Sequence, residues 1–271
     1  MMKSPRTIIC LILFFRRRDE MIVRDDGHHL VCIHQDEHAR LSAACYREWA
    51  DPIIEKKIWN ERLHTAIVEH DRAWIPLDTH PIWNEEEGRP YDFTNYPERE
   101  KIAAYQTGIN ETEMMDEWAG LLVSRHLHSF FAQIRTDAAE AFKAEEQKRW
   151  ERLRGEEESD DEKRALAVLK MCDELSLFAC MNHPGARKEE EVPWFRDGFS
   201  MRFDFLNRQN VMPSWKNEEE IVLTPAPLGD KVQFPLKLRR VSKESIRDDG
   251  WKIAYDSTPI ATQVVTFLTT S

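Results

Sequence analysis

Four segments of the chain repeat apolar residues at helical spacing, and each carries an ionisable side chain on its apolar face. His38 shares a face with leucine, cysteine and tryptophan residues, and His70 shares one with leucine, isoleucine and tryptophan. His126 lies between apolar residues placed one helical turn before and after it, and Asp173 is in line with several leucines. Because residues three and four apart lie on one side of a helix, we expect all four side chains in the core of a helical domain.

The cost of burying these groups constrains how the helices can pack. An unpaired polar group in a core costs about 1–3 kcal/mol, and a lone charged carboxylate costs more. The cost is offset if the four side chains converge on a cation, and imidazole and carboxylate ligands together suit zinc, iron or manganese. Each histidine alone is more often a hydrogen-bonded core residue than a ligand. Asp173 is the stronger indication, because an aspartate on an apolar helix face is rare without a partner.

Asp71 adds a second carboxylate directly after His70. The two adjacent side chains can reach one ion only if the helix ends or bends there, and Pro76 shortly afterwards favours such an ending. Asp71 also has simpler explanations, since it could cap a neighbouring helix or form an ion pair with Arg72 or Arg125. We predict a buried metal site in the helical core. The predicted metal ligands are His38, His70, Asp71, His126 and Asp173.

A loop rich in proline and aromatic residues follows this pair over residues 78–97. Its prolines forbid a long helix, and a long loop inside a compact domain either packs across the surface or covers a site. As a lid, the loop would bring Trp83 and Tyr96 to a flat substrate such as a nucleobase by stacking, although ordinary packing explains its aromatic residues equally well. The aromatic residues of the loop are Trp83, Tyr91, Phe93 and Tyr96.

The remaining patterns predict a mainly α fold with β structure at both ends. Residues 21–33 are expected to form a β-hairpin, because two apolar runs flank Asp26 and Gly27, a dipeptide that tolerates the positive φ angles of a tight turn. Alternating apolar and polar residues predict strands near the C-terminus. The expected helices cover residues 34–49, 52–74, 113–134, 138–154 and 164–181, with another beginning near 98, and the expected strands cover 221–223, 232–238 and 264–268.

These elements divide the chain into three predicted parts. Residues 21–190 form the helical domain, and residues 191–271 form a small β-rich C-terminal appendage. Residues 1–20 are expected to be an N-terminal extension in which three arginines close a short apolar run at 8–15. No small-residue cleavage site follows, and the run is too short to cross a bilayer. A short anchor at a membrane surface is the alternative for this segment.

Composition narrows the classes of function. The formal net charge of −11 argues against a nucleic-acid or anionic-membrane partner, because both select for basic surfaces. The five cysteines form no C-x-x-C pair and their number is odd, which predicts reduced, buried thiols in a cytoplasmic protein. The sequence has no Gly-rich phosphate loop and no G-x-S-x-G elbow. We therefore expect a small-molecule substrate, no nucleic acid and no membrane span.

The order of the ionisable residues resembles the HD-domain superfamily of metal-dependent phosphohydrolases. On this resemblance, His38, His70, Asp71 and Asp173 match the metal ligands, and the fold would be an HD-like helical bundle. His126 matches a histidine that in some members binds a second metal or the substrate phosphate. The stretches HQDEHARLSA, VEHDRAW, GLLVSRHLHSFF and CDELSLF also look like an uncharacterised bacterial family of domains of unknown function.

The resemblance implies a hydrolase of small phosphoesters. A divalent metal ion (manganese, iron, zinc or magnesium) would lower the pKa of a bound water. Asp71, Asp78 and His126 are the candidate catalytic residues, with Asp78 as a general base. Arg72 and Arg125 are candidate phosphate clamps, because guanidinium binds phosphate in a bidentate fork. Each arginine could equally form an ion pair with Asp71 or a nearby glutamate.

Two other classes of protein fit the same residues. A non-haem di-iron oxygenase uses a similar helical ligand set, and iron content with oxygen-dependent turnover would identify it. A domain without catalytic activity could keep the polar cluster as a binding or sensing site, or as buried structure. Metal-free purified protein whose melting is unchanged by a chelator would support this third class and exclude the other two.

Overall fold

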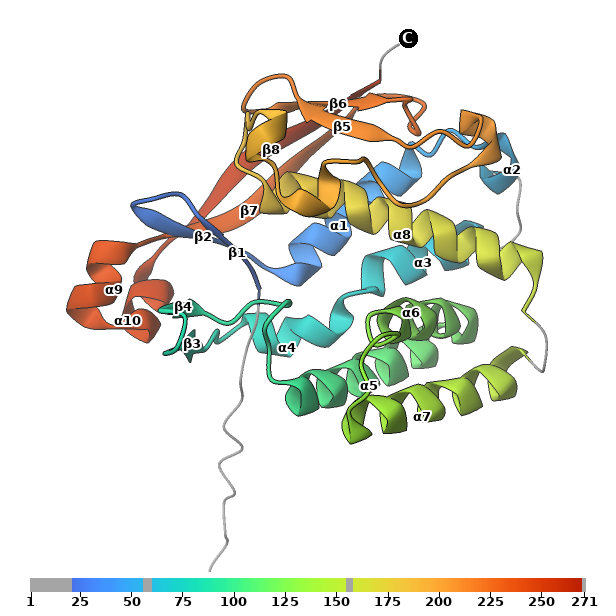
Figure 1. The fold of residues 1–271 in the computed structure, drawn as a ribbon, viewed down its shortest axis with the longest axis horizontal. Coiled ribbons are helices and arrows are strands. Elements are labelled where there is room, and N and C mark those ends of the chain that lie inside the picture. The colour runs from blue at the N-terminus through green and yellow to red at the C-terminus, as the bar shows by residue number, and fades with distance from the viewer. Residues whose placement is uncertain (1–20, 56–59, 155–157, 270–271) are drawn as a thin grey trace, which may run out of the picture.

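The chain combines a curled six-stranded β-sheet with layers of helices (Figure 1). The computed structural model describes residues 21–55, 60–154 and 158–269, and the predicted N-terminal extension, residues 1–20, lies outside this part. In the described residues, no helix is both long enough and apolar enough to cross a membrane. The described cysteines are buried free thiols, as the sequence predicts. They are Cys32, Cys45, Cys172 and Cys180.

The strands of the large sheet follow the order β1-β2-β7-β8-β6-β5. Strands β6 and β8 run parallel, and the other neighbours are antiparallel. A separate two-stranded ribbon is formed by β3 (Trp83–Asn84) and β4 (Arg89–Pro90). The strands of the large sheet are β1 (Ile22–Asp25), β2 (His29–Ile33), β5 (Met212–Trp215), β6 (Glu220–Thr224), β7 (Val232–Ser242) and β8 (Ile260–Thr269).

The prediction of a mainly α, HD-like helical bundle with small β appendages is wrong. The N-terminal hairpin forms as predicted, with Gly27 at a φ of 85° in its turn. However, β2 pairs with β7, so that Leu30 lies opposite Val241, and β7 also pairs with β8. The two ends of the chain therefore build one sheet. Each strand pattern is local, whereas pairing between distant segments depends on tertiary packing, which the patterns do not contain.

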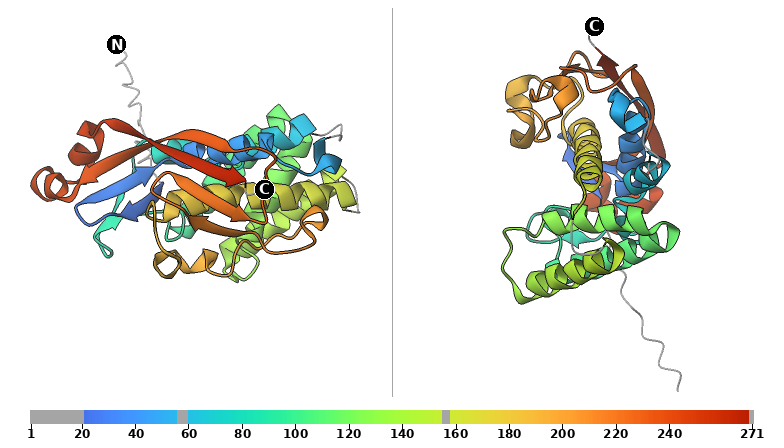
Figure 2. Two further views of the ribbon diagram at one scale, coloured as in Figure 1. Left: turned by 90° about the horizontal axis from the view of Figure 1, so that it is seen from above. Right: turned by 90° about the vertical axis from the view of Figure 1, so that its right-hand side faces the viewer.

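Two long helices, α1 (Gln35–Arg47) and α8 (Asp160–Met181), pack against each other and against the sheet (Figure 2). Helix α3 (Asn60–Glu69) packs on both of them, and α6 (Glu117–Ser129) packs on α3 and α8. The four helices predicted to carry ionisable residues are therefore neighbours. The other helices are α2 (Pro52–Glu55), α4 (Ile75–Asp78), α5 (Glu98–Met115), α7 (Asp137–Arg154), α9 (Lys243–Asp249) and α10 (Trp251–Ser257), and the 3-10 helices are η1 (Arg72–Trp74), η2 (Lys188–Glu190), η3 (Pro193–Phe195) and η4 (Asp204–Leu206).

A glycine in α5 sets the distance between this helix and η1. A Cβ atom on Gly108 would lie 2.6 Å from the backbone nitrogen of Ala73, which is closer than packed atoms can approach. We expect Gly108→Ala to lower the free energy of unfolding by about 1–3 kcal/mol, measured by urea denaturation. Alanine is otherwise favoured in a helix by about 1 kcal/mol, so a gain in stability would contradict the close approach. Gly229→Ala is the control, because its nearest contact would be 3.7 Å away.

Candidate metal centre

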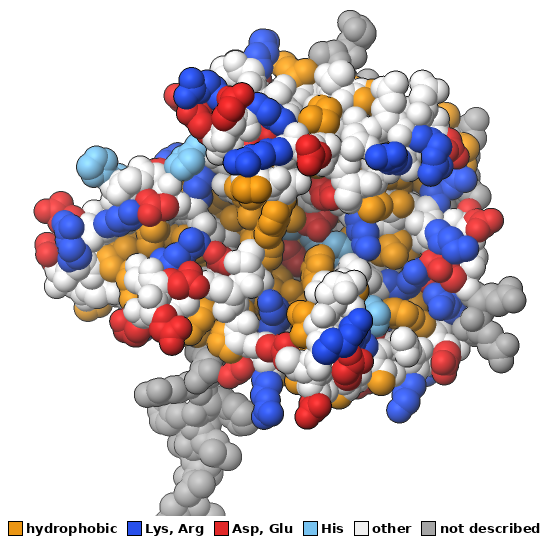
Figure 3. All heavy atoms as spheres, in the orientation of Figure 1, with side chains coloured by type: hydrophobic (Ala, Val, Ile, Leu, Met, Phe, Trp, Pro, Cys, Tyr) orange, Lys and Arg blue, Asp and Glu red, His pale blue; other side chains and the backbone are white. Residues whose placement is uncertain are grey.

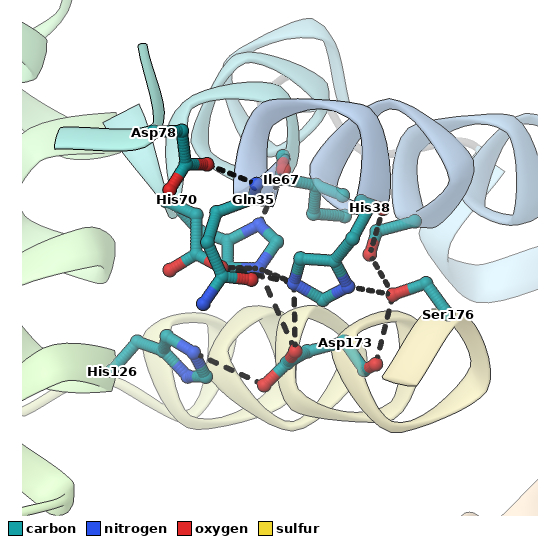
Figure 4. Close-up of polar contacts among 10 residues, drawn as sticks. Gln35, His38, Ile67, His70, Asp78, His126, Asp173 and Ser176 are labelled. Carbon is teal, nitrogen blue, oxygen red and sulfur yellow. Dashed lines mark hydrogen bonds and ion pairs between the residues drawn. The ribbon is translucent and has the colours of Figure 1, made fainter. Parts of the chain in front are cut away.

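The His70-Asp71 pair lies where α3 ends. The helix stops at Glu69, and Asp71 directly precedes η1. The backbone N–H of Trp74 donates to the carbonyl of Asp71 at 3.0 Å, which begins the new turn. The helix end predicted at this position is confirmed, and it lets both adjacent side chains approach His38 of α1. Figure 4 shows His70 between α1 and α8.

Side-chain acceptor atoms of four residues converge in this space, and Figure 4 labels three of the residues, His38, His70 and Asp173. Nε2 of His38 lies 3.1 Å from Nε2 of His70 and 3.0 Å from Oδ2 of Asp71. It also lies 3.3 Å from Oδ1 of Asp173, and Nε2 of His70 lies 3.6 Å from both of these carboxylate oxygens. Ligand atoms about 2.1 Å from one metal ion are about 3.0–3.4 Å apart in octahedral or tetrahedral geometry. The three distances from Nε2 of His38 fall in this range, and the two from Nε2 of His70 to the carboxylates are slightly longer, so these atoms approach the spacing of one coordination shell.

Hydrogen bonds on the far side of each imidazole orient its Nε2 lone pair into the cluster. Nδ1–H of His70 donates to the carbonyl of Ile67 at 2.7 Å. Nδ1–H of His38 donates to Oγ of Ser176 at 2.6 Å, and this hydroxyl in turn donates to the carbonyl of Asp173 at 2.9 Å. Such contacts fix the tautomer and the ring orientation of metal-ligating histidines. With both Nδ1 atoms protonated, the neutral rings present only acceptors to each other.

A shell made only of acceptors needs a positive charge at its centre. Without a metal ion, that charge is a proton on His70: burial alone would lower the pKa of this imidazole, but Asp71 and Asp173 outweigh burial and raise the pKa to about 9. Burial opposes ionisation of Asp173, yet its contacts with His126 and His70 hold the pKa of this carboxyl below its usual range. One proton carries a single positive charge, whereas a divalent cation has the two charges needed to neutralise both carboxylates.

His126 borders the cluster from α6. Its Nε2 lies 3.3 Å from Oδ2 of Asp173, while Oδ1 of the same carboxylate faces His38. Both ring nitrogens of His126 are buried and lack a well-aligned hydrogen bond within the described residues. Burial lowers the pKa of His126, although Asp173 opposes this shift, so the ring is neutral near pH 7. His70, His126 and Asp173 form a second group with metal-ligand spacing. The structure therefore brings together the five side chains predicted as ligands.

A cavity of about 570 Å³ opens onto this cluster. Four of the five side chains line it: His38, Asp71, His126 and Asp173. The space-filling view is hollowed near its centre, where hydrophobic side chains surround acidic and histidine side chains that lie deeper (Figure 3). Volumes of about 300–1,000 Å³ are typical of pockets for small molecules. The residues of the cluster are thus accessible to a small ligand although the cluster itself is buried.

The two arginines predicted as phosphate clamps have other partners and do not line the cavity. Arg72 forms ion pairs with Glu69 at 3.0 Å and Glu111 at 2.7 Å. Arg125 pairs with Glu162 at 2.6 Å and also with Glu158. Both arginines follow the alternative of salt bridges to nearby glutamates, and we do not carry them into the proposed function.

The aromatic loop contributes to the cavity through a residue other than those predicted. Trp83 packs on Trp251, with ring centroids 5.7 Å apart, and Tyr96 is buried against Trp74. Neither Trp83 nor Tyr96 lines the cavity, whereas Phe93 from the same loop does. The loop therefore both packs on the protein surface and forms one wall of the cavity.

Asp78, predicted as a general base, holds the start of α1. Its carboxylate accepts the backbone N–H of Gln35, the first residue of that helix (Figure 4). Asp78 also lies near His34 and Asp36 in a third group with metal-ligand spacing, but Nε2 of His34 is already bonded to the hydroxyl of Tyr255 at 2.9 Å. Asp78 does not line the cavity. Its position favours a structural role in anchoring the helix that carries His38.

Replacing this carboxylate tests that role. We expect Asp78→Ala to lower the free energy of unfolding by about 1–3 kcal/mol, because α1 loses a buried acceptor at its N-terminus. Metal content per folded molecule should be unchanged. Asp137→Ala, which removes an exposed carboxylate from the first turn of α7, is the control and should cost less. Full stability with lost hydrolytic activity in Asp78→Ala would instead favour the general base.

The sequence patterns did not indicate three residues that line the cavity, Gln35, Lys170 and Trp194, or Ser176, which bonds to His38. Lys170 lies on α8 three residues before Asp173, and Ser176 lies three residues after it, so the helical face of Asp173 could have indicated both. Gln35 begins α1, and Trp194 belongs to η3. No periodic pattern marks these two positions, because tertiary packing brings them to the cavity.

The fold and the site together define a protein of helices and a mixed, largely antiparallel sheet, with a buried histidine–aspartate cluster beside a cavity. The chain belongs to a family described as a protein of unknown function (DUF3891), whose match covers residues 21–243. The predicted membership of a family of unknown function is thereby confirmed, whereas nothing in the match connects the chain to the HD-domain superfamily. The chain matched no curated protein and no solved structure in the comparisons.

Proposed function

We propose that the protein is a metal-dependent hydrolase of small phosphoesters. The observation that carries this proposal is the convergence of acceptor atoms from His70, Asp71 and Asp173 on Nε2 of His38, beside a cavity of about 570 Å³. These residues would hold a divalent cation, and two nitrogen and two oxygen donors suit manganese, iron or zinc, with magnesium less well matched to imidazole. When bound, the cation supplies Lewis-acid chemistry and lowers the pKa of a coordinated water towards neutrality.

Two residues of the cluster have further roles in the proposed reaction. Asp71 lines the cavity and directs Oδ2 to His38, which leaves its other carboxylate oxygen to accept a proton from the attacking water. His126 lines the cavity beside Asp173, and its neutral imidazole would donate a hydrogen bond to a phosphoryl oxygen as charge develops there. A second cation between His126 and Asp173 is the alternative for this histidine.

Metal reconstitution tests the proposal. The protein would be stripped with a chelator, reloaded separately with manganese, iron, zinc and magnesium, and assayed with phosphomonoesters and phosphodiesters. We expect hydrolysis to appear on loading with at least one metal and to be lost in His126→Ala. Iron uptake with oxygen consumption and no hydrolysis would identify an oxygenase instead. Protein that takes up no metal and melts unchanged would identify a domain in which the cluster is structural.

A further inference from the structure

The cavity extends well beyond the metal-ligating cluster, and its outer part is aromatic. Phe93, Phe130 and Trp194 line it from the loop after β4, the end of α6 and η3, respectively, and we call these three residues the aromatic rim. Phe130 is 50% exposed and Trp194 is 58% exposed, which is unusual for such large apolar side chains. Exposed apolar groups gathered around a cavity mark a surface that a ligand covers.

The rim is continuous with the cluster. The ring of Phe130 lies edge-on to that of His126, with centroids 4.8 Å apart. Phe93 and Trp194 contact each other in the same manner at 6.2 Å. Aromatic rings favour such edge-to-face and offset contacts with another ring. A planar ring bound between these residues would thus have the reacting bond near His126.

A cationic side chain lines the cavity one helical turn from Asp173. Lys170 lines the cavity and has no hydrogen bond or ion pair within the described residues. Lys101 also lines the cavity, but its Nζ donates to the carbonyl of Phe93 at 3.1 Å. Two acidic residues lie nearby: Asp173 faces His38 and His126, and Glu174 accepts the backbone N–H of Ser200. Lys170 is therefore available to pair with an anion.

A buried amide also lines the cavity. Gln35 lines it and is 1% exposed, yet its Oε1 has no hydrogen-bond partner within the described part of the chain. Leaving a buried carbonyl unpaired is costly, so a group that donates to it is expected in the bound state. The attacking water, or the proton of a phosphate monoanion, would satisfy this atom.

We infer that the substrate is a phosphomonoester of an alcohol that carries an aromatic ring, with Lys170 at the phosphoryl group and the ring in the aromatic rim. This inference rests on the proposed function. The aromatic rim can hold one organic group, and a phosphomonoester carries one such group on its phosphate. In the reaction, water adds its oxygen to phosphorus, and the bond from phosphorus to the ester oxygen breaks with its electron pair on that oxygen. The ester oxygen takes up a proton, so that phosphate and the free alcohol are released.

Binding of phosphonates tests this assignment without turnover. Isothermal titration would compare benzylphosphonate, cyclohexylmethylphosphonate and methylphosphonate on the protein with and without added metal. We expect benzylphosphonate to bind most tightly. Lys170→Gln should weaken its binding by about tenfold or more, because a charged hydrogen bond is lost. Lys163→Gln, on the exposed side of the same helix, is the matched control and should bind normally.

Substitutions of Trp194 test the role of the aromatic rim. Trp194→Leu keeps an apolar side chain and should weaken benzylphosphonate by about three- to tenfold without affecting methylphosphonate, whereas Trp194→Phe should restore binding. Equal affinity for the benzyl and cyclohexylmethyl compounds, or normal binding by Lys170→Gln, would overturn the inference. The protein could also fail to take up metal and still bind benzylphosphonate through Lys170. That result would support the assigned ligand and refute the proposed metal-dependent hydrolysis.

Discussion

The double variant His70→Ala/Asp71→Ala is expected to lose its bound metal almost completely. The variant removes one nitrogen and one oxygen from a four-atom shell, and the atoms that remain, on His38 and Asp173, are 3.3 Å apart on two different helices. Two ligands hold a divalent cation far more weakly than four. Elemental analysis after gel filtration measures the effect as moles of metal per mole of protein.

The same variant should separate the contribution of metal to stability from that of packing. A ligand present at about a thousand times its Kd stabilises the folded state by about 4 kcal/mol. We expect adding metal to raise the free energy of unfolding of the original protein and to leave that of the variant unchanged. Urea denaturation with and without a chelator gives both values.

A matched control lies on the same helix. Glu61→Ala/His64→Ala removes a carboxylate and an imidazole from α3, but both side chains lie outside the cluster. This control should keep its metal and its response to chelator. Equal metal content in the His70→Ala/Asp71→Ala variant and the original protein would refute the metal centre.

The site could be predicted better than the fold, and the reason is physical. His38, His70, His126 and Asp173 were recognised because helical periodicity places each on an apolar face, and burial of polar groups demands a partner. The expectation that these side chains converge rests on the cost of burying them and does not depend on how the strands pair. In the structure, the acceptor atoms of His38, His70 and Asp173 lie 3.1–3.6 Å apart.

The sheet was misjudged because its pairing is not a local property. The alternation along Val232–Ser242 predicts a strand, but nothing in it indicates that Leu30 will lie opposite Val241. The surroundings of the two predicted phosphate clamps could not be predicted for a similar reason. Arg72 and Arg125 have the right chemistry for phosphate, yet glutamates one turn away or on a neighbouring helix neutralise them. Lys170 was overlooked although it differs from them in having no such partner among the described residues.

Metal affinity is expected to rise steeply with pH, because metal and proton compete for His70. In the metal-free protein, burial opposes the charge on this imidazole, but Asp71 and Asp173 raise its pKa from the ordinary 6.5 to about 9. A proton must leave Nε2 before that atom can bind a cation. Below pH 9 the deprotonated fraction falls tenfold for each pH unit, so Kd should increase by about a hundredfold from pH 8 to pH 6.

The stability of the metal-free protein should change with pH in the opposite direction. Because the pKa of His70 is raised on folding, protonated His70 stabilises the fold fully below pH 6.5, and this contribution is lost as the pH rises towards 9. Asp173 stays ionised throughout this range because its pKa is lowered. Competition with a chelator of known pH dependence gives Kd, and urea denaturation gives the stability. A Kd that does not change between pH 6 and pH 8 would show that the His70 proton does not occupy the site, and the acceptor cluster would then need another source of positive charge.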